Sequence, residues 1–157
     1  MLKQLLTIFK IVLVYFFSLS ISHADLIKPN NTINPHQVVK MQLKSLKYND
    51  NPFKDNGIKQ VWEFAHPNNQ KNTGPLKNFI KMIKGKSYRV LLNHLDHKII
   101  QLRLTNSMAS YEVIILDKKK SYFKFNWQVE RYSKDGPLKN CWLTVMVSSP
   151  VSLGSSI

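Results

Sequence analysis

Two histidines that lie close together in the sequence are the residues best suited to chemistry. His94 and His97 are three positions apart in the stretch LLNHLDHK, with Asp96 between them. Imidazole nitrogens bind transition metals, and a neutral imidazole can act as a general base near pH 7. A protein zinc site needs three or four ligands. The distant residues that could complete such a site are His36, His66 and Glu63. We therefore expect no metal ion here and no cofactor elsewhere.

His94 itself has two interpretations. It follows a short apolar segment that ends in Leu92 and Asn93, so its ring could bond the free carbonyl groups at the end of a helical turn. Alternatively, Asn93 and His94 could line the mouth of a pocket, where His94 would serve as a general base. The first interpretation is favoured. His97 precedes a strand and lies between Asp96 and Lys98, which predicts exposure to solvent.

A carboxylate and two tyrosines complete the set of catalytic candidates. Glu63 lies between Trp62 and Phe64, and burial there would raise its pKa into a useful range; an exposed helix face is the favoured alternative. Tyr88 or Tyr111 could donate a hydrogen bond to a substrate. The candidates for catalysis are thus His94, Glu63 and Tyr88. The sequence has no phosphate-binding glycine loop, no nucleophile elbow and no paired-carboxylate motif.

Several apolar and polar side chains could form a ligand pocket, although core packing is the favoured role of the large ones. These pocket candidates are Trp62, Phe64, Phe79, Met82, Trp127, Asn93 and His94. Asp50 and Asp55 flank a turn rich in Asn, Pro and Gly, so they are expected to shape that turn. Cys141 begins an apolar run and is expected to be buried. As the only cysteine, it excludes an internal disulfide.

The N-terminal residues have the form of an export signal. Lys3 and Lys10 supply positive charge, residues 11–17 are continuously apolar, and Ser22 and Ala24 form an A-x-A-like cleavage site. We expect cleavage after Ala24 and export to the periplasm or the exterior. The alternative is an N-terminal membrane anchor, although the apolar run is shorter than the roughly 20 residues that a spanning helix needs.

The charge of the chain narrows the range of partners. It contains 23 Lys and Arg against 9 Asp and Glu, giving a net charge of +14, which falls to +12 without Lys3 and Lys10. Nearly all of the excess is lysine, and the lysines are scattered apart from residues 118–120. Bidentate recognition of phosphate or guanine favours arginine. We therefore expect no nucleic acid partner. No run after residue 24 is long and apolar enough to span a membrane, so we also expect no transmembrane segment in the mature chain.

Residues 25–34 are expected to be a flexible leader, residues 35–149 a single domain and residues 150–157 a flexible tail. Asn34 followed by Pro35 predicts the start of a helix with an apolar face down to Leu46. A second helix is predicted over residues 58–65, and Pro67 prevents it from continuing. A third begins with Thr73 as its cap, carries Phe79 and Ile83 on one face, and stops at Gly85.

From Ile99 onward the apolar period changes to two, which predicts strands. Ile100, Leu102 and Leu104 alternate with polar residues in the first strand. YEVIIL is a second strand, and CWLTVMV is a fourth. In the third, the apolar set Phe123, Phe125, Trp127 and Val129 alternates with the polar set Lys124, Asn126, Gln128 and Glu130. The predicted fold class is α+β, with three N-terminal helices packed on a curved antiparallel four-stranded sheet.

The segments HQVVKMQLKSLKYND, GIKQVWEFAHPNN, TGPLKNFIKMI, YRVLLNH and the late WLT resemble the bacterial, cyanobacterial and plant family known as domain of unknown function 4864. The resemblance runs from about His36 to Thr144. It implies a relative of the SnoaL-like, or nuclear-transport-factor-two-like, α+β cone, in which a curved sheet and helices enclose one pocket. That fold carries both enzymes and non-catalytic modules, so it does not assign an activity.

These observations favour a non-catalytic, exported module that binds a small apolar ligand or a partner protein. The alternative is a small isomerase or hydrolyase that acts on a hydrophobic substrate with a pocket His or Glu as base. A third hypothesis, binding of the lysines to an anionic surface, predicts affinity that falls steeply with salt. Pairing of two copies through the outer face of the sheet is left open.

Overall fold

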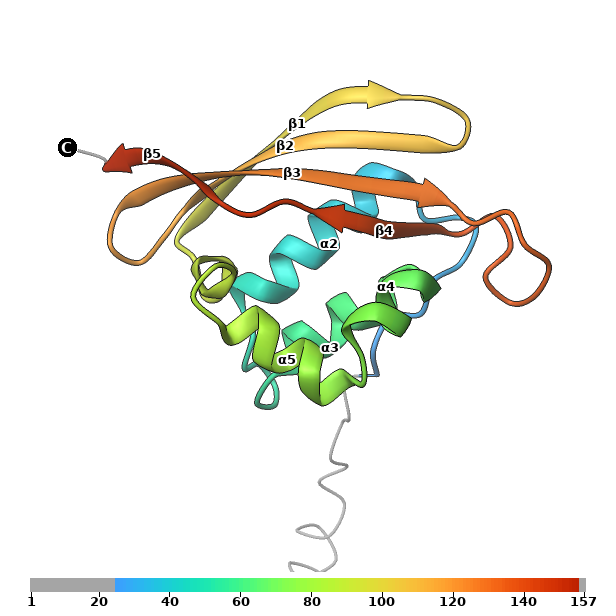
Figure 1. Ribbon diagram of the computed structural model, residues 1–157, viewed down its shortest axis with the longest axis horizontal. Coiled ribbons are helices and arrows are strands. Elements are labelled where there is room, and N and C mark those ends of the chain that lie inside the picture. Colours follow the sequence, from blue (N-terminus) through green and yellow to red (C-terminus); the bar gives the residue numbers. More distant parts are fainter. Residues whose placement is uncertain (1–24, 156–157) are drawn as a thin grey trace, which may run out of the picture.

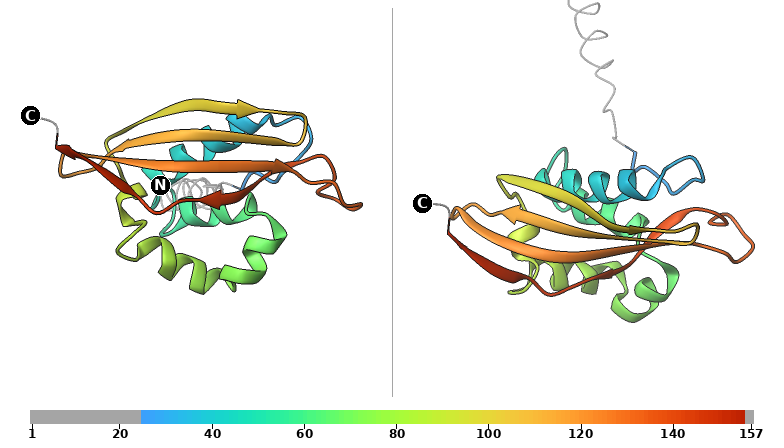
Figure 2. Two further views of the ribbon diagram at one scale, coloured as in Figure 1. Left: turned by 45° about the horizontal axis from the view of Figure 1, so that its top comes forward. Right: turned by 90° about the horizontal axis from the view of Figure 1, so that it is seen from above.

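The structure is a computed structural model that describes residues 25–155. Its helices are α2 (Pro35–Lys47), α3 (Asn56–Glu63), α4 (Pro67–Thr73) and α5 (Leu76–Lys84), with a short 3-10 turn, η1 (Arg89–Leu91). Its strands are β1 (Asp96–Leu104), β2 (Met108–Leu116), β3 (Ser121–Arg131), β4 (Trp142–Val147) and β5 (Val151–Ser155). The four helices lie on one side of an antiparallel sheet (Figures 1 and 2). The predicted α+β class is confirmed at this level.

Helix α2 packs directly against the sheet. Asn34 caps it: its side chain accepts a hydrogen bond from the backbone N–H of Gln37, and the Gln37 side chain accepts one from the N–H of Asn34. This reciprocal capping box satisfies two N–H groups that the first helical turn leaves free. The buried face of α2 consists of Val38, Val39, Gln42, Leu43 and Leu46. The predicted start and the apolar face of this helix are confirmed.

Helices α2 and α3 approach so closely that a glycine is required between them. A Cβ atom on Gly57 would lie 2.1 Å from the backbone oxygen of Ser45 and 2.8 Å from the Cα of Asn49. The N–H of Gly57 donates to the carbonyl of Asn49 at 2.8 Å, and the Asn49 side chain accepts from the N–H of Ile58. The turn-rich segment after α2 is therefore a tight backbone junction that fixes where α3 begins.

The region expected to hold one helix after Pro67 holds two. Pro67 is the first residue of α4, and the ring of His66 accepts a hydrogen bond from the N–H of Asn68 as the N-cap. Thr73 is therefore not the cap of the next helix but the last residue of α4, and its hydroxyl donates to the carbonyl of Asn69. The proline was interpreted as a helix stop, although its fixed φ also suits a first helical turn. Helix α5 ends at Gly85, as predicted.

The inward face of the sheet is built on β3. Phe125, Trp127 and Val129 are buried and Phe123 is partly buried against the same core. In the β2–β3 register, Tyr111 pairs with Trp127 and Val113 with Phe125, so the buried rows of the two central strands lie side by side. The predicted inward row is confirmed, and the helices cover it (Figure 1).

In β1, the alternating apolar residues Ile100, Leu102 and Leu104 do not form the buried row. Ile99, rather than Ile100, packs on the core and pairs with Val113, whereas Leu102 and Leu104 are 59% and 54% exposed. The register shifts between Gln101 and Arg103, and such a bulge changes which face a side chain takes. β1 is an edge strand, so half of its apolar residues remain uncovered.

Both ends of the described chain differ from the expected flexible segments. Residues Val151–Ser155 form β5, which pairs with Ser121–Lys124 at one end of β3, while β4 pairs with the other end. Part of the tail that was expected to be flexible is therefore a strand, whose backbone pairs with β3. Near the other end, Ile27 exchanges two backbone hydrogen bonds with the Gln60 side chain, which holds the leader against α3.

The expected signal, residues 1–24, lies outside the described residues. Between residues 25 and 155, no helix combines the length and the apolar character needed to cross a membrane.

Candidate functional site

A cavity of about 230 Å³ lies between the helices and the β3–β4 side of the sheet. Its lining is mainly apolar and comes from every helix: Gln42, Leu46, Val61, Ala65, Asn69, Thr73, Phe79, Met82, Ile83, Tyr88, Leu91, Trp127 and residues 144–147. Met82 on α5 is 36% exposed, whereas Trp127 is 1% exposed. The cavity thus reaches solvent on the side of Met82 and closes at Trp127.

A buried polar network forms the closed end of the cavity. The Gln42 side-chain oxygen accepts hydrogen bonds from the Thr144 hydroxyl at 2.7 Å and from the Trp127 indole N–H at 3.2 Å. The Gln42 amide nitrogen donates to the carbonyl of Val61 at 3.3 Å. Burying a polar group is tolerated when it finds partners. These bonds therefore allow α2, α3, β3 and β4 to meet at one point.

Two further polar side chains of the lining, Asn69 and Tyr88, are directed at the backbone of β4. The Asn69 amide donates to the carbonyls of Thr144 and Val145, at 2.9 and 2.8 Å, and the Tyr88 hydroxyl donates to the carbonyl of Val147 at 3.1 Å. These contacts use backbone groups that an edge strand would otherwise expose. No Asp, Glu, His, Lys or Arg of residues 25–155 lines the cavity.

The cavity contains some of the candidates expected from the sequence and leaves out others. Phe79, Met82, Trp127 and Tyr88 line it. Phe64 is fully buried in the core, and Trp62 packs on Phe79 with ring centroids 5.0 Å apart, behind the cavity wall. Asn93 has a positive φ of 53° and its N–H donates to the carbonyl of Leu46, so it shapes a turn.

His94 lies outside the cavity, at the end of the turn that η1 makes. It is 2% exposed, and its Nδ1 lies 2.7 Å from the carbonyl oxygen of Leu91, the contact expected of a histidine at a helix end. Its Nε2 lies 2.8 Å from Nδ1 of His97. Burial lowers the pKa of His94 from 6.5 to about 4. It also lowers that of His97, which is half-buried rather than exposed as expected.

Glu63 is directed at the leader. Its carboxylate pairs with Lys28 at 2.8 Å, and its side chain is 23% exposed. His36 and His66 lie against Tyr111 and Tyr132, respectively, rather than near His94. In the part of the chain that the structure describes, no three His, Cys, Asp or Glu side chains gather as a metal site would require.

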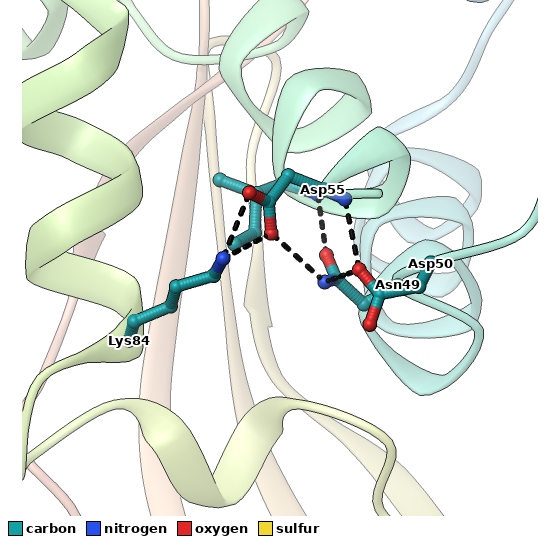
Figure 3. Close-up of polar contacts among 5 residues, drawn as sticks. Asn49, Asp50, Asp55 and Lys84 are labelled. Carbon is teal, nitrogen blue, oxygen red and sulfur yellow. Dashed lines mark hydrogen bonds and ion pairs between the residues drawn. The ribbon is translucent and has the colours of Figure 1, made fainter. Parts of the chain in front are cut away.

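An ion pair fixes α5, the helix that carries Phe79 and Met82. Lys84, at the end of α5, pairs with the Asp55 carboxylate at 2.6 Å, and Asn49 donates to the same carboxylate (Figure 3). Burial raises the pKa of Asp55, but the bonds from Lys84 and Asn49 outweigh it and hold the pKa below 3.8. Asp55 is therefore charged at neutral pH and ties the cavity wall to the α2–α3 junction.

Four polar residues of the site were missed as pocket candidates: Gln42, Asn69, Thr73 and Thr144. Gln42 did carry a signal. It lies four residues after Val38 and four before Leu46, so a polar side chain stands in the middle of a buried helical stripe, where it needs a buried partner. Thr144 follows no comparable pattern, since a threonine within a strand is common.

Comparison of the chain with protein-family models, with curated proteins and with solved structures finds no match in any of the three.

Proposed function

We propose that the protein is a non-catalytic binding module whose central cavity holds a small apolar ligand. One observation carries the proposal: the cavity opens to solvent, yet its walls are mainly apolar and its polar side chains bond to one another or to the backbone of α3, α4 and β4. Such a cavity offers little to a charged ligand and favours the transfer of an apolar one from water.

The volume sets the size of the ligand. An apolar cavity of about 150 Å³ accommodates benzene. The 230 Å³ available here therefore suits a substituted benzene or a fused bicycle such as indole. For a ligand with indole's nine non-hydrogen atoms, a Kd between roughly 10 μM and 1 mM is a reasonable expectation.

The same proposal includes the fold family and the compartment. Helices on one side of an antiparallel sheet, with a pocket between the layers, support a SnoaL-like cone. The charged, apolar and small-residue pattern of the N-terminal sequence supports export. The isomerase or hydrolyase hypothesis has no comparable support, because neither His94 nor Glu63 lines the cavity.

The test is a calorimetric titration with indole on the protein and two variants. Met82→Trp places a large ring at the mouth of the cavity and should weaken binding at least tenfold. Leu102→Trp makes the same kind of change at an exposed position of β1 and should leave the Kd within twofold. Equal affinity in all three proteins would exclude this cavity as the binding site.

A further inference from the structure

A second cavity, larger and of different character, lies at another end of the molecule. It has a volume of about 490 Å³ and lies between the segment around η1 and the turn that joins β2 to β3. Its lining residues are Lys86, Arg89, Val90, Leu92, Asp117, Lys118, Lys119, Ser121, Phe123 and Pro150. None of them lines the first cavity, so the two cavities can bind independently.

The lining is strongly cationic. It contains the four basic side chains of Lys86, Arg89, Lys118 and Lys119 against one carboxylate, Asp117. Among the described residues, none of these four cations forms an ion pair. Positive charges around one cavity repel one another unless an anion lies between them, and here the protein supplies only the carboxylate of Asp117.

The single carboxylate is committed to the turn. Oδ1 of Asp117 accepts hydrogen bonds from the backbone N–H groups of Lys119 and Ser121, at 2.8 and 2.9 Å. The N–H of Asp117 in turn donates to the carbonyl of Ser121 at 2.9 Å. Asp117 thus fixes the backbone of the turn that carries Lys118 and Lys119.

The cavity also has an apolar wall. Val90, Leu92 and Phe123 line it and are partly buried against the core of the domain. Phe123 is partly exposed, whereas Phe125 in the same row of β3 is buried. A ligand for this cavity would gain from carrying an apolar body beside its charge.

We infer that the second cavity binds a phosphate monoester attached to an apolar group. The four cations exceed the one carboxylate by three charges, which suits a dianion better than a singly charged carboxylate. Arg89 can bond two phosphate oxygens at once, and the lysines supply further positive charge. Val90, Leu92 and Phe123 accept the apolar part. The phosphate can belong to a soluble aryl or alkyl phosphate or to the headgroup of a lipid.

The binding test compares three probes by titration at a fixed ionic strength. Phenyl phosphate should bind at least tenfold more tightly than inorganic phosphate, because only the former reaches the apolar wall. Vesicles of phosphatidylcholine with phosphatidic acid, compared with phosphatidylcholine alone, test the lipid source. Binding of phenyl phosphate alone assigns a soluble ligand, and vesicle binding assigns a lipid. If neither binds, the inference is wrong.

Paired variants separate a site from general charge attraction. Lys118→Gln with Lys119→Gln should weaken binding of the preferred probe roughly tenfold, and so should Arg89→Gln. Lys71→Gln with Lys77→Gln removes the same charge from exposed positions on α4 and α5 and should change the Kd less than twofold. Equal losses of affinity in both double variants would show that net charge alone causes the binding, and the proposed site would be wrong. Indole binding should be unchanged in all of them.

Discussion

Nε2 of His94 lies 2.8 Å from Nδ1 of His97. The other nitrogen of His94 contacts the carbonyl of Leu91, which can only accept a hydrogen bond, so the proton of a neutral His94 must be on Nδ1. Its Nε2 then accepts, and Nδ1 of His97 must donate. The pair is thus an ordered chain that runs from His97 through His94 to the backbone of η1, and it ties β1 to the turn before it.

The pH dependence of folding follows from this burial. The folded protein holds the pKa of His94 near 4, below its ordinary value of 6.5, so the unfolded chain binds the proton more readily between these values. The contribution of His94 to stability is therefore complete above about pH 6.5 and is lost as the pH falls toward 4, by about 3 kcal/mol. His97 adds a loss of the same sign.

Urea denaturation between pH 4.5 and 7.5 measures this effect. The wild-type free energy of unfolding should decrease as the solution is acidified. His94→Gln should be less stable than the wild type at pH 7.5, but its free energy of unfolding should depend much less on pH. If the variant depends on pH as steeply as the wild type, groups other than His94 cause the pH dependence.

The hydrogen bond between Gln42 and Thr144 should contribute to the free energy of unfolding. Gln42→Leu leaves the Thr144 hydroxyl and the Trp127 N–H without their shared acceptor and should cost about 1–3 kcal/mol. Thr144→Val should reduce the free energy of unfolding less in the Gln42→Leu variant than in the wild-type protein. The double-mutant cycle should yield a coupling of about 1 kcal/mol; strictly additive losses would show that the two side chains do not act together.

The ion pair between Lys84 and Asp55 should matter more than an exposed pair. Its side chains are 39% and 13% exposed, against 53% and 91% for Lys139 and Asp135. Lys84→Met should lower stability by about 1 kcal/mol, while Lys139→Met should cost less than about 0.5 kcal/mol. Thermal unfolding of both variants provides the comparison. Equal small effects would show that the α5 wall does not depend on this pair.

The inward row of β3 gives a prediction about packing. Phe125 is fully buried, and Phe125→Ala should cost about 3–5 kcal/mol. Leu102→Ala, at a residue that is 59% exposed, should change stability by less than about 0.5 kcal/mol. A reversal of this order in chemical denaturation would contradict the assignment of the faces of β1 and β3.

The sequence predicted those elements whose signals are local. The Asn34–Pro35 start of α2 and the alternation in β3 depend on capping and on period, and both are confirmed. The burial of β1 was misassigned because a bulge and an edge position, which no local pattern encodes, decided which side chains are covered. β5 was missed for a related reason, since its pairing depends on free backbone groups of β3.

The site was predictable to a similar extent. Phe79 and Trp127, which were pocket candidates although core packing was their favoured role, line the cavity because they face the layer between helices and sheet. The arrangement of Asn69, Thr144 and Tyr88 around β4 depends on contacts between distant segments. Their roles could therefore be assigned only once the fold was known.

The most direct measurement of the central claim is a titration of the ¹⁵N-labelled protein with indole, followed by NMR. If the ligand enters the cavity, the largest shifts should occur at the amides of Met82, Thr144 and Met146 and at the indole N–H of Trp127, with little change at β1. Saturation without shifts at these positions, or no shifts at millimolar indole, would contradict the account.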